Sequence, residues 1–170
     1  DKITVSTLVD SLNAFKSNIR NGNTYAMMNL NGGFDTPRVL TSLSNKNKYK
    51  YHCNTQGYPN YHIGKPSAKT IQTLKLLLAH QYTYIGAPHI WAGDEMGMWG
   101  ADDPSSRKPL LWSDYTFEDE QVHPLGVERP ADQVELNREL LNYYQKLIAM
   151  RKVHPVLVHG DLAFIPINDE

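Results

Sequence analysis

Two segments of the chain present carboxylates directly after short apolar runs. Residues 29–38 turn through glycines and then present Asp35. Residues 92–107 also turn through glycines, and they carry Asp103 and Arg107. Carboxylates accept hydroxyl hydrogens in pairs, and a guanidinium presents a fixed fork of donors. Because barrel enzymes place their catalytic groups at the C-terminal ends of strands, the two segments indicate a catalytic site at the strand ends of a barrel.

Alternating helix and strand patterns would position these two segments. Apolar residues at helical spacing predict helices over residues 5–19, 68–84 and 134–153. Short, nearly all-apolar runs predict strands over residues 25–30 and 88–92, of the kind that is buried on both faces of a sheet. Each segment that carries carboxylates therefore follows a predicted strand.

Turn and loop residues separate these elements. The expected helix signals are a turn at residues 21–23 after the first helix, an N-cap at Ser67, a stop at Gly86 and a stop at His154-Pro155. The expected loops are residues 31–38, 44–67 and 93–133. Loops as long as the last two, inside a compact unit, are usually functional.

The order of the predicted elements indicates the fold class. Strands that alternate with helices indicate an α/β protein with a parallel sheet. Two strands cannot close a TIM (β/α)8 barrel, which has eight strands and roughly 250 residues. We therefore predict that residues 1–154 are the C-terminal part of such a barrel, with its last two strands, in a longer protein. Residues 155–170 would begin a C-terminal all-β sandwich domain, with strands over 156–158 and 162–167.

The two segments resemble a known family in their sequence and in their order. Gly33-Phe34-Asp35-Thr36-Pro37-Arg38 is followed, after a predicted helix, by Gly93-Asp94-Glu95 and then by Asp103-Pro104-Ser105-Ser106-Arg107. This succession resembles the last two strand-and-loop units of the α-amylase superfamily of glycoside hydrolases, family 13. The closer likeness is to the neopullulanase and cyclomaltodextrinase branch, and it covers residues 29–155.

The resemblance implies a role for individual residues. Asp35 would be the third catalytic carboxylate of the family, the one that stabilises the transition state. Phe34 stands where the family usually has a histidine, so it could stack on the sugar but not donate a hydrogen bond to it. Asp103 and Arg107 would bind the sugar next to the cleavage point.

The tryptophans are assigned from their positions in the sequence. Trp99, in the loop next to Asp103, is the best candidate for a platform on which a sugar stacks. Trp91 lies in a predicted strand and is expected in the core, and Trp112 is expected to pack inside.

Simpler interpretations of the same residues stay open. Asp35 could cap a backbone N–H in an ordinary turn, as aspartates often do. Asp103 and Arg107 could form a surface ion pair of little energetic value. Asp94 and Glu95 mostly shape the strand end in the family, so we assign them no chemistry.

The resemblance also implies a reaction and what that reaction needs. It implies a retaining double displacement on α-1,4-linked glucans such as starch, pullulan or cyclodextrins. The nucleophile and the acid/base would precede Asp1, in the rest of the parent catalytic domain, so the chain alone is predicted to be inactive. One alternative is a catalytically inactive amylase-like sugar-binding or structural subunit, which Phe34 keeps open. A second is an unrelated α/β barrel enzyme in which the motifs are coincidental. The particular glucan and the choice between hydrolysis and transglycosylation stay open.

Composition argues against several other classes of protein. The net charge is −1 and no basic stripe or basic amphipathic helix is present, so neither nucleic acid nor membrane insertion is expected. Cys53 is alone, in a polar segment that gives it no catalytic context. We predict no cofactor and no metal in this segment, because its histidines lack zinc spacing and its acidic loops lack a calcium-ligand pattern.

The expected partners follow from the resemblance. They are an α-glucan oligosaccharide or polysaccharide and the rest of the parent catalytic domain. Calcium elsewhere in the parent and homo-oligomerisation both stay open. A bacterial periplasmic or extracellular location is slightly favoured over the cytoplasm.

Overall fold

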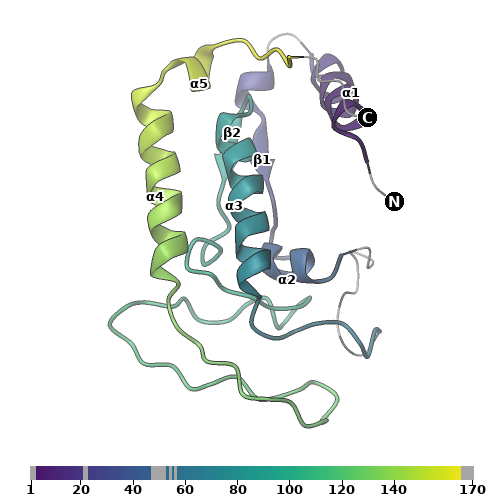
Figure 1. Cartoon of the computed structure of the whole chain (residues 1–170), viewed down its shortest axis with the longest axis vertical. Coiled ribbons are helices and arrows are strands. Elements are labelled where there is room, and N and C mark those ends of the chain that lie inside the picture. Colours follow the sequence, from purple (N-terminus) through teal and green to yellow (C-terminus); the bar gives the residue numbers. More distant parts are fainter. Residues whose placement is uncertain (1–2, 21–22, 47–52, 54, 56, 166–170) are drawn as a thin grey trace.

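The computed structural model describes residues 3–20, 23–46, 53, 55 and 57–165 (Figure 1). The helices are α1 (Val5–Ser17), α2 (Val39–Ser44), α3 (Ala68–Thr83), α4 (Arg138–Val153) and α5 (Val156–His159). A 3-10 turn, η1 (Asn23–Ala26), precedes strand β1 (Met28–Leu30), and strand β2 is Ala87–His89. Among the described residues, no helix combines the length and the hydrophobicity needed to cross a membrane.

The two strands lie side by side and run in the same direction. Met28 pairs with Ala87 and Leu30 pairs with His89, so the connection through α2 and α3 is a crossover between parallel neighbours. This is the α/β arrangement that the sequence predicts, and it is consistent with part of a (β/α)8 barrel. The long loops gather at the end of the strands where α2 begins (Figure 1). The segments after both strands therefore start from the same edge of the sheet.

The main core lies where α3 packs against α2 and α4. Its buried members are Val39, Leu40, Leu74, Leu78, Tyr82, Leu140, Tyr144 and Leu147. Burial of such side chains stabilises the fold by roughly 1.5–3 kcal/mol each. The rings of Tyr82 and Tyr144 meet edge to face, with centroids 6.4 Å apart, which fixes α3 against α4.

Two buried polar side chains tie the helices to the strands. Gln81 of α3 donates through Nε2 to the carbonyl of Asn29 at 2.6 Å and to the carbonyl of His89 at 3.0 Å. Arg151 of α4 donates to the carbonyl of Tyr84 at 3.2 Å, just before β2. Because buried polar groups need partners, these bonds fix where each strand lies against its covering helix.

Side-chain caps and a glycine set the helix boundaries. The Ser67 hydroxyl accepts from the N–H of Thr70 at 3.1 Å, which confirms the predicted N-cap of α3. Helix α4 begins later than predicted because Asn137 caps it, accepting from the N–H of Leu140 at 2.9 Å. Gly86 has φ +102°, and a Cβ there would lie 2.6 Å from a backbone carbonyl, so the turn into β2 requires glycine.

The first strand differs from its prediction. Residues 23–26 form η1, and only Met28–Leu30 are extended. The strand is not buried on both faces, since Met28 is 57% exposed, and among the described residues no strand other than β2 pairs with it. Of the turn predicted at 21–23, residues 21 and 22 lie outside the described residues, and α1 already ends at Ser17.

Two further elements differ from the sequence predictions. Residues 39–44 form helix α2, which is too short to give a periodic signal. Residues 156–159 form helix α5, so the strand predicted at 156–158 is wrong. Pro155 has φ −56° and ψ −24°, a helical conformation that starts a turn. Residues 160–165 are not in a strand, residues 166–167 lie outside the described part, and the domain division at 155 stays a prediction.

Candidate active site

The loop after β1 is a tight turn that points two side chains outward. The hydroxyl of Thr36 accepts from the N–H of Gly33 at 3.2 Å and donates to the Gly33 carbonyl at 3.1 Å. Phe34 and Asp35 lie within this turn, and both are exposed. Asp35 accepts no backbone hydrogen bond within the described ranges, so Thr36, and not Asp35, closes the turn.

The loop after β2 is folded closely on itself. Gly93 has φ +101°, and a Cβ at this position would collide with the sulfur of Met98. The Glu95 carboxylate accepts from the N–H of Gly93 at 2.9 Å. The carbonyl of Gly100 then accepts from the N–H of Arg38 at 3.0 Å, which joins this loop to the end of the first one. The compact turn thus brings residues 100–107 next to the loop that carries Asp35.

Four predicted site residues meet where the two loops join. Arg107 donates from Nε to Asp103 Oδ1 at 3.0 Å, and its Nη2 lies 3.9 Å from Asp35 Oδ1. The Arg107 guanidinium also lies 5.6 Å from the centre of the Phe34 ring. We call these residues, Phe34, Asp35, Asp103 and Arg107, the strand-end cluster.

The strand-end cluster is open to solvent. The side chains of Asp103 and Arg107 are each 49% exposed, and that of Asp35 is 76% exposed. Exposed ion pairs contribute about 0–1 kcal/mol, so this cluster adds little to stability. Its charged groups are instead available to a hydroxyl-rich ligand, which can accept from the guanidinium and donate to the carboxylates.

A buried ion pair lies under the cluster. Arg38 Nη1 donates to Asp94 Oδ1 at 3.1 Å, and both side chains are at least 95% buried. Arg38 also donates from Nε to the carbonyl of Ser106 at 2.9 Å and from Nη1 to the carbonyl of Ala92 at 2.7 Å. Its guanidinium stacks on Trp91, 3.7 Å from the ring centre. Arg38 therefore holds the backbone next to Arg107.

Sequence reasoning gave Arg38 no role, although one signal was present. An arginine between Pro37 and the apolar pair Val39-Leu40 starts a helix that faces the core. Arginine is almost never fully buried unless it is paired, so a buried carboxylate elsewhere was to be expected. Asp94 is that carboxylate, which agrees with the expectation that it shapes the strand end.

The pKa of Asp94 reflects this burial. Desolvation raises the pKa to about 6, while the charge of Arg38 and its hydrogen bond pull the pKa down and Glu95 adds to the rise. Burial disfavours the charged form of a carboxyl group even beside a cation. Asp94 is consequently a structural group whose charge is sensitive to mildly acidic pH.

The tryptophans differ from the sequence predictions. Trp99 is only 4% exposed and lines a separate pocket, so the structure does not bring it into the strand-end cluster as a platform. Its position follows from a loop that folds inward after Met98, itself part of a small apolar core. Trp112, expected to pack inside, is exposed. Trp91, expected in the core, is half-buried under Arg38.

Metal-ligand groups and the cysteine can be judged among the described residues. No group of three or more His, Cys, Asp or Glu residues in the described part of the chain is arranged to hold a metal ion. Cys53 is fully buried, and burial raises the pKa of its thiol. A thiol that stays protonated is a poor nucleophile.

Comparison with known proteins places the chain in a family. Residues 2–160 match the family described as Alpha amylase, catalytic domain. The chain belongs to this family. Its curated relatives confirm the predicted resemblance to the neopullulanase and cyclomaltodextrinase branch of glycoside hydrolase family 13.

Two curated relatives and one solved structure illustrate the similarity. The chain is 31% identical over 145 residues to a cyclomaltodextrinase from Geobacillus thermopakistaniensis (strain MAS1), covering 85% of this chain and 17% of the relative. It is 31% identical over 146 residues to a maltogenic alpha-amylase from Bacillus acidopullulyticus, covering 85% and 18%. The chain therefore spans less than a fifth of the length of these relatives.

The solved structure shows the shared fold. It is the ligand-free cyclic alpha-maltosyl-(1-->6)-maltose hydrolase from Arthrobacter globiformis, with a TM-score of 0.67 and 23% identity. The match covers 98% of this chain and 28% of that chain. The parallel pair β1–β2 with its helices is thus the fold of part of an alpha-amylase catalytic domain.

Proposed function

We propose that the chain forms the last two strand units of the catalytic barrel of a retaining α-glucan glycosidase. The observation that carries the proposal is the meeting of Asp35, Asp103 and Arg107 from the ends of two parallel neighbouring strands. Sites at this edge of a barrel are where catalytic groups gather. The names of the curated relatives, a cyclomaltodextrinase and a maltogenic alpha-amylase, support α-1,4-linked glucans as the substrate class.

In this proposal Asp35 stabilises the transition state. Cleavage of a glycosidic bond builds positive charge on the sugar as it becomes an oxocarbenium ion. A carboxylate on a fixed turn beside the sugar favours that charge more than it favours the neutral substrate. Arg107 and Asp103 hold the neighbouring sugar through its hydroxyl groups, with Phe34 offering an apolar face.

The nucleophile and the acid/base come from barrel units outside these residues in this proposal. A retaining mechanism needs two carboxyl groups about 5–5.5 Å apart, one on each face of the scissile bond. Asp35 supplies neither role, and its nearest carboxylate in the cluster, Asp103, is bound to Arg107. The chain alone would then bind sugar without cleaving it.

A second candidate function rests on Phe34. The resemblance puts a histidine at this position, and Phe34 is 60% exposed on the turn beside Asp35. A phenyl ring gives stacking without a hydrogen bond to the sugar. A catalytically inactive amylase-like protein that binds α-glucan, or serves as a structural subunit, would tolerate this exchange.

Assays of the parent protein and of the purified 170-residue chain separate the candidates. Soluble starch, pullulan and a cyclodextrin are the substrates, and proton NMR records the anomer that is released first. The proposal expects turnover by the parent with the α-anomer released, and none by the chain. Turnover that follows the isolated chain through purification contradicts the proposal that the nucleophile lies outside this chain. A folded parent that binds maltotriose without turnover supports the second candidate.

A further inference from the structure

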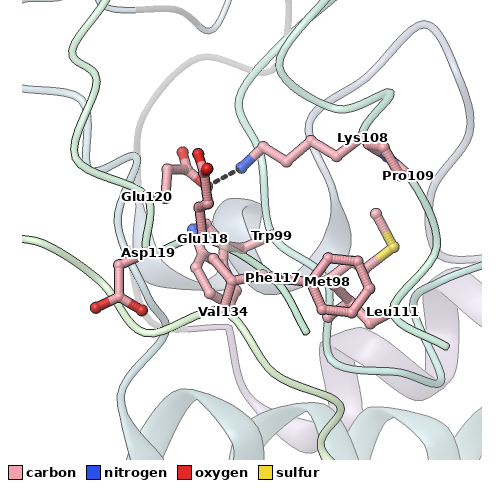
Figure 2. Close-up of a pocket in the computed structure, with 10 residues that line it drawn as sticks. All are labelled: Met98, Trp99, Lys108, Pro109, Leu111, Phe117, Glu118, Asp119, Glu120 and Val134. Atoms are coloured by element: carbon pink, nitrogen blue, oxygen red, sulfur yellow. Dashed lines mark hydrogen bonds and ion pairs between the residues drawn. The ribbon is translucent and has the colours of Figure 1, made fainter. Parts of the chain in front are cut away.

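A pocket lies in the loop region that follows β2, and its lining includes none of the residues of the strand-end cluster (Figure 2). Its volume is about 330 Å³, and it lies between segment 98–111 and segment 117–120, with Val134 closing it. Small-molecule sites start at about 300 Å³, so the pocket is the size of a small ligand. Because Lys108 of its lining directly follows Arg107, the pocket and the cluster share one loop.

The interior of the pocket is apolar and aromatic. Met98 and Leu111 belong to one small core, against which Phe117 and Val134 pack. Trp99 is almost fully buried, and its indole Nε1 has no hydrogen-bond partner among the described residues. A buried donor without a partner costs about 1–3 kcal/mol, and this N–H is shielded from solvent, so it is not counted among the groups that contact a ligand.

The polar part of the pocket combines acceptors with one cation. Figure 2 shows the Lys108 side chain extended toward Glu120, and the two form an ion pair. The Lys108 ammonium also lies 5.4 Å from the centre of the Trp99 ring. Glu118 and Asp119 are exposed and make no ion pair within the described part of the chain. Their carboxylates are available to accept hydrogen bonds.

We propose that this pocket binds one glucosyl unit of an α-glucan, as a sugar site separate from the strand-end cluster. The inference rests on the proposed function for its ligand and adds a second place where that ligand is held. A pyranose has an apolar face that suits the partly exposed side chains of Phe117 and Val134, and a rim of hydroxyl groups that suits the carboxylates. The volume admits a single unit and not a long oligosaccharide.

The charges of the lining argue against other ligand classes. Glu118, Asp119 and Glu120 oppose a single lysine, so a phosphate or a carboxylate would meet net repulsion. A wholly apolar ligand would leave the charged groups with nothing to bind and would bury part of their surface from water. A neutral, hydroxyl-rich ligand avoids both costs.

The test uses maltose and the indole N–H signals of the intact chain. Trp99→Phe identifies the Trp99 signal in a nitrogen–proton NMR spectrum, and maltose is then titrated into the unchanged protein. The inference expects a saturable shift of the Trp99 signal that persists in Arg107→Ala. Replacing both Glu118 and Asp119 with alanine should weaken this binding about tenfold, because bonds to charged acceptors are lost. Both residues are exposed, so the double variant should keep the spectrum of the folded protein.

The outcomes distinguish this site from the proposed function. No shift of the Trp99 signal with maltose overturns the inference, and so does a shift that disappears in Arg107→Ala or is unchanged in the double variant. A shift with cyclohexanol but not with maltose also overturns it, since the pocket would then be simply apolar. None of these results affects turnover by the parent, on which the proposed function depends. Conversely, an inactive parent that still shows the maltose shift leaves this site standing.

Discussion

Arg38 and Asp94 form a buried ion pair that joins the two strand ends, with Arg38 Nη1 3.1 Å from Asp94 Oδ1. Arg38 follows the turn that carries Asp35, and Asp94 opens the loop that carries Arg107. The pair therefore connects the two halves of the strand-end cluster through a rigid, solvent-free contact. An exposed pair in the same place would have left the two loops free to move apart.

Removing one member of this pair should destabilise the protein. Arg38→Met keeps much of the side-chain volume but leaves Asp94 buried without its cation, and such losses cost about 3–5 kcal/mol. The matched control is Arg107→Met, which breaks only exposed pairs and should cost less than about 1 kcal/mol. Urea unfolding followed by circular dichroism measures both variants. Equal midpoints for the two variants would contradict the structural role of Arg38.

The raised pKa of Asp94 gives a pH dependence with a definite sign. The folded state holds the proton up to about pH 6, whereas the unfolded carboxyl group loses it near its ordinary value of 3.8. Between these values the folded state binds more protons, so this group makes the free energy of unfolding fall as pH rises from 4 to 6. Above pH 6 both states are ionised and the contribution is constant.

Asp94→Asn isolates this contribution. The difference in unfolding free energy between the unchanged protein and the variant should fall by about 1–3 kcal/mol from pH 4 to pH 6, and then level off. Carbon-13 NMR of the Asp94 carboxyl group checks the same quantity directly. A measured pKa below 4 would show that Arg38 outweighs burial, and it would reverse the sign of the effect.

The sequence could predict the long helices and the parallel class of the sheet, because these follow from local periodicity. Both boundaries of helix α3 lie within one residue of the prediction, and Ser67 marks its start. The strands are shorter than predicted because a strand ends where its neighbour ends, and β1 has only β2 beside it among the described residues. This strand pairing cannot be predicted from the local sequence.

In the candidate site too, local motifs could be predicted, whereas contacts between distant segments could not. The two motifs assigned Asp35 and Arg107 to one predicted site, and in the structure Arg107 Nη2 lies 3.9 Å from Asp35 Oδ1. Arg38 and Asp94 are 56 positions apart in sequence, and nothing local shows that they meet. Trp99 stands in a polar loop, which suggested exposure, but the loop folds inward and buries it. Contacts between distant segments decided each of these outcomes.

If the parent protein is the proposed glycosidase, Asp35→Asn should lower its kcat far more than it raises KM. In the proposed role the carboxylate would act on charge that develops mainly in the transition state, so its loss should cost at least ~10²-fold in kcat. Asp114→Asn is the matched control, because Asp114 is an exposed loop residue outside the strand-end cluster. Steady-state kinetics on a cyclodextrin measures both. Near-normal kcat in a folded Asp35→Asn protein would remove Asp35 from catalysis.

The isolated chain should associate through its exposed strand. Met28 lies on β1 with an exposed side chain and an unpaired strand edge among the described residues, an arrangement that favours pairing with another chain. Met28→Lys should reduce the apparent mass in light scattering, because a charge on the edge opposes pairing. Leu76→Lys is the control, since Leu76 is a single exposed apolar residue on α3. A monomeric unchanged chain would contradict the expectation.

Arg107 should contribute to binding more than to chemistry. If its guanidinium grips the neighbouring sugar, the ground state and the transition state both lose that contact in Arg107→Ala, and KM should rise more than kcat falls. Loss of a charge-assisted hydrogen bond corresponds to about 10- to 100-fold weaker binding. Arg107→Lys should restore only part of it, because an ammonium lacks the planar fork that also bonds Asp103. Calorimetric titration of maltotriose into a catalytically silenced parent measures the affinity. A rim ion pair without a binding role would leave that affinity unchanged in both variants, since exposed pairs are worth less than about 1 kcal/mol.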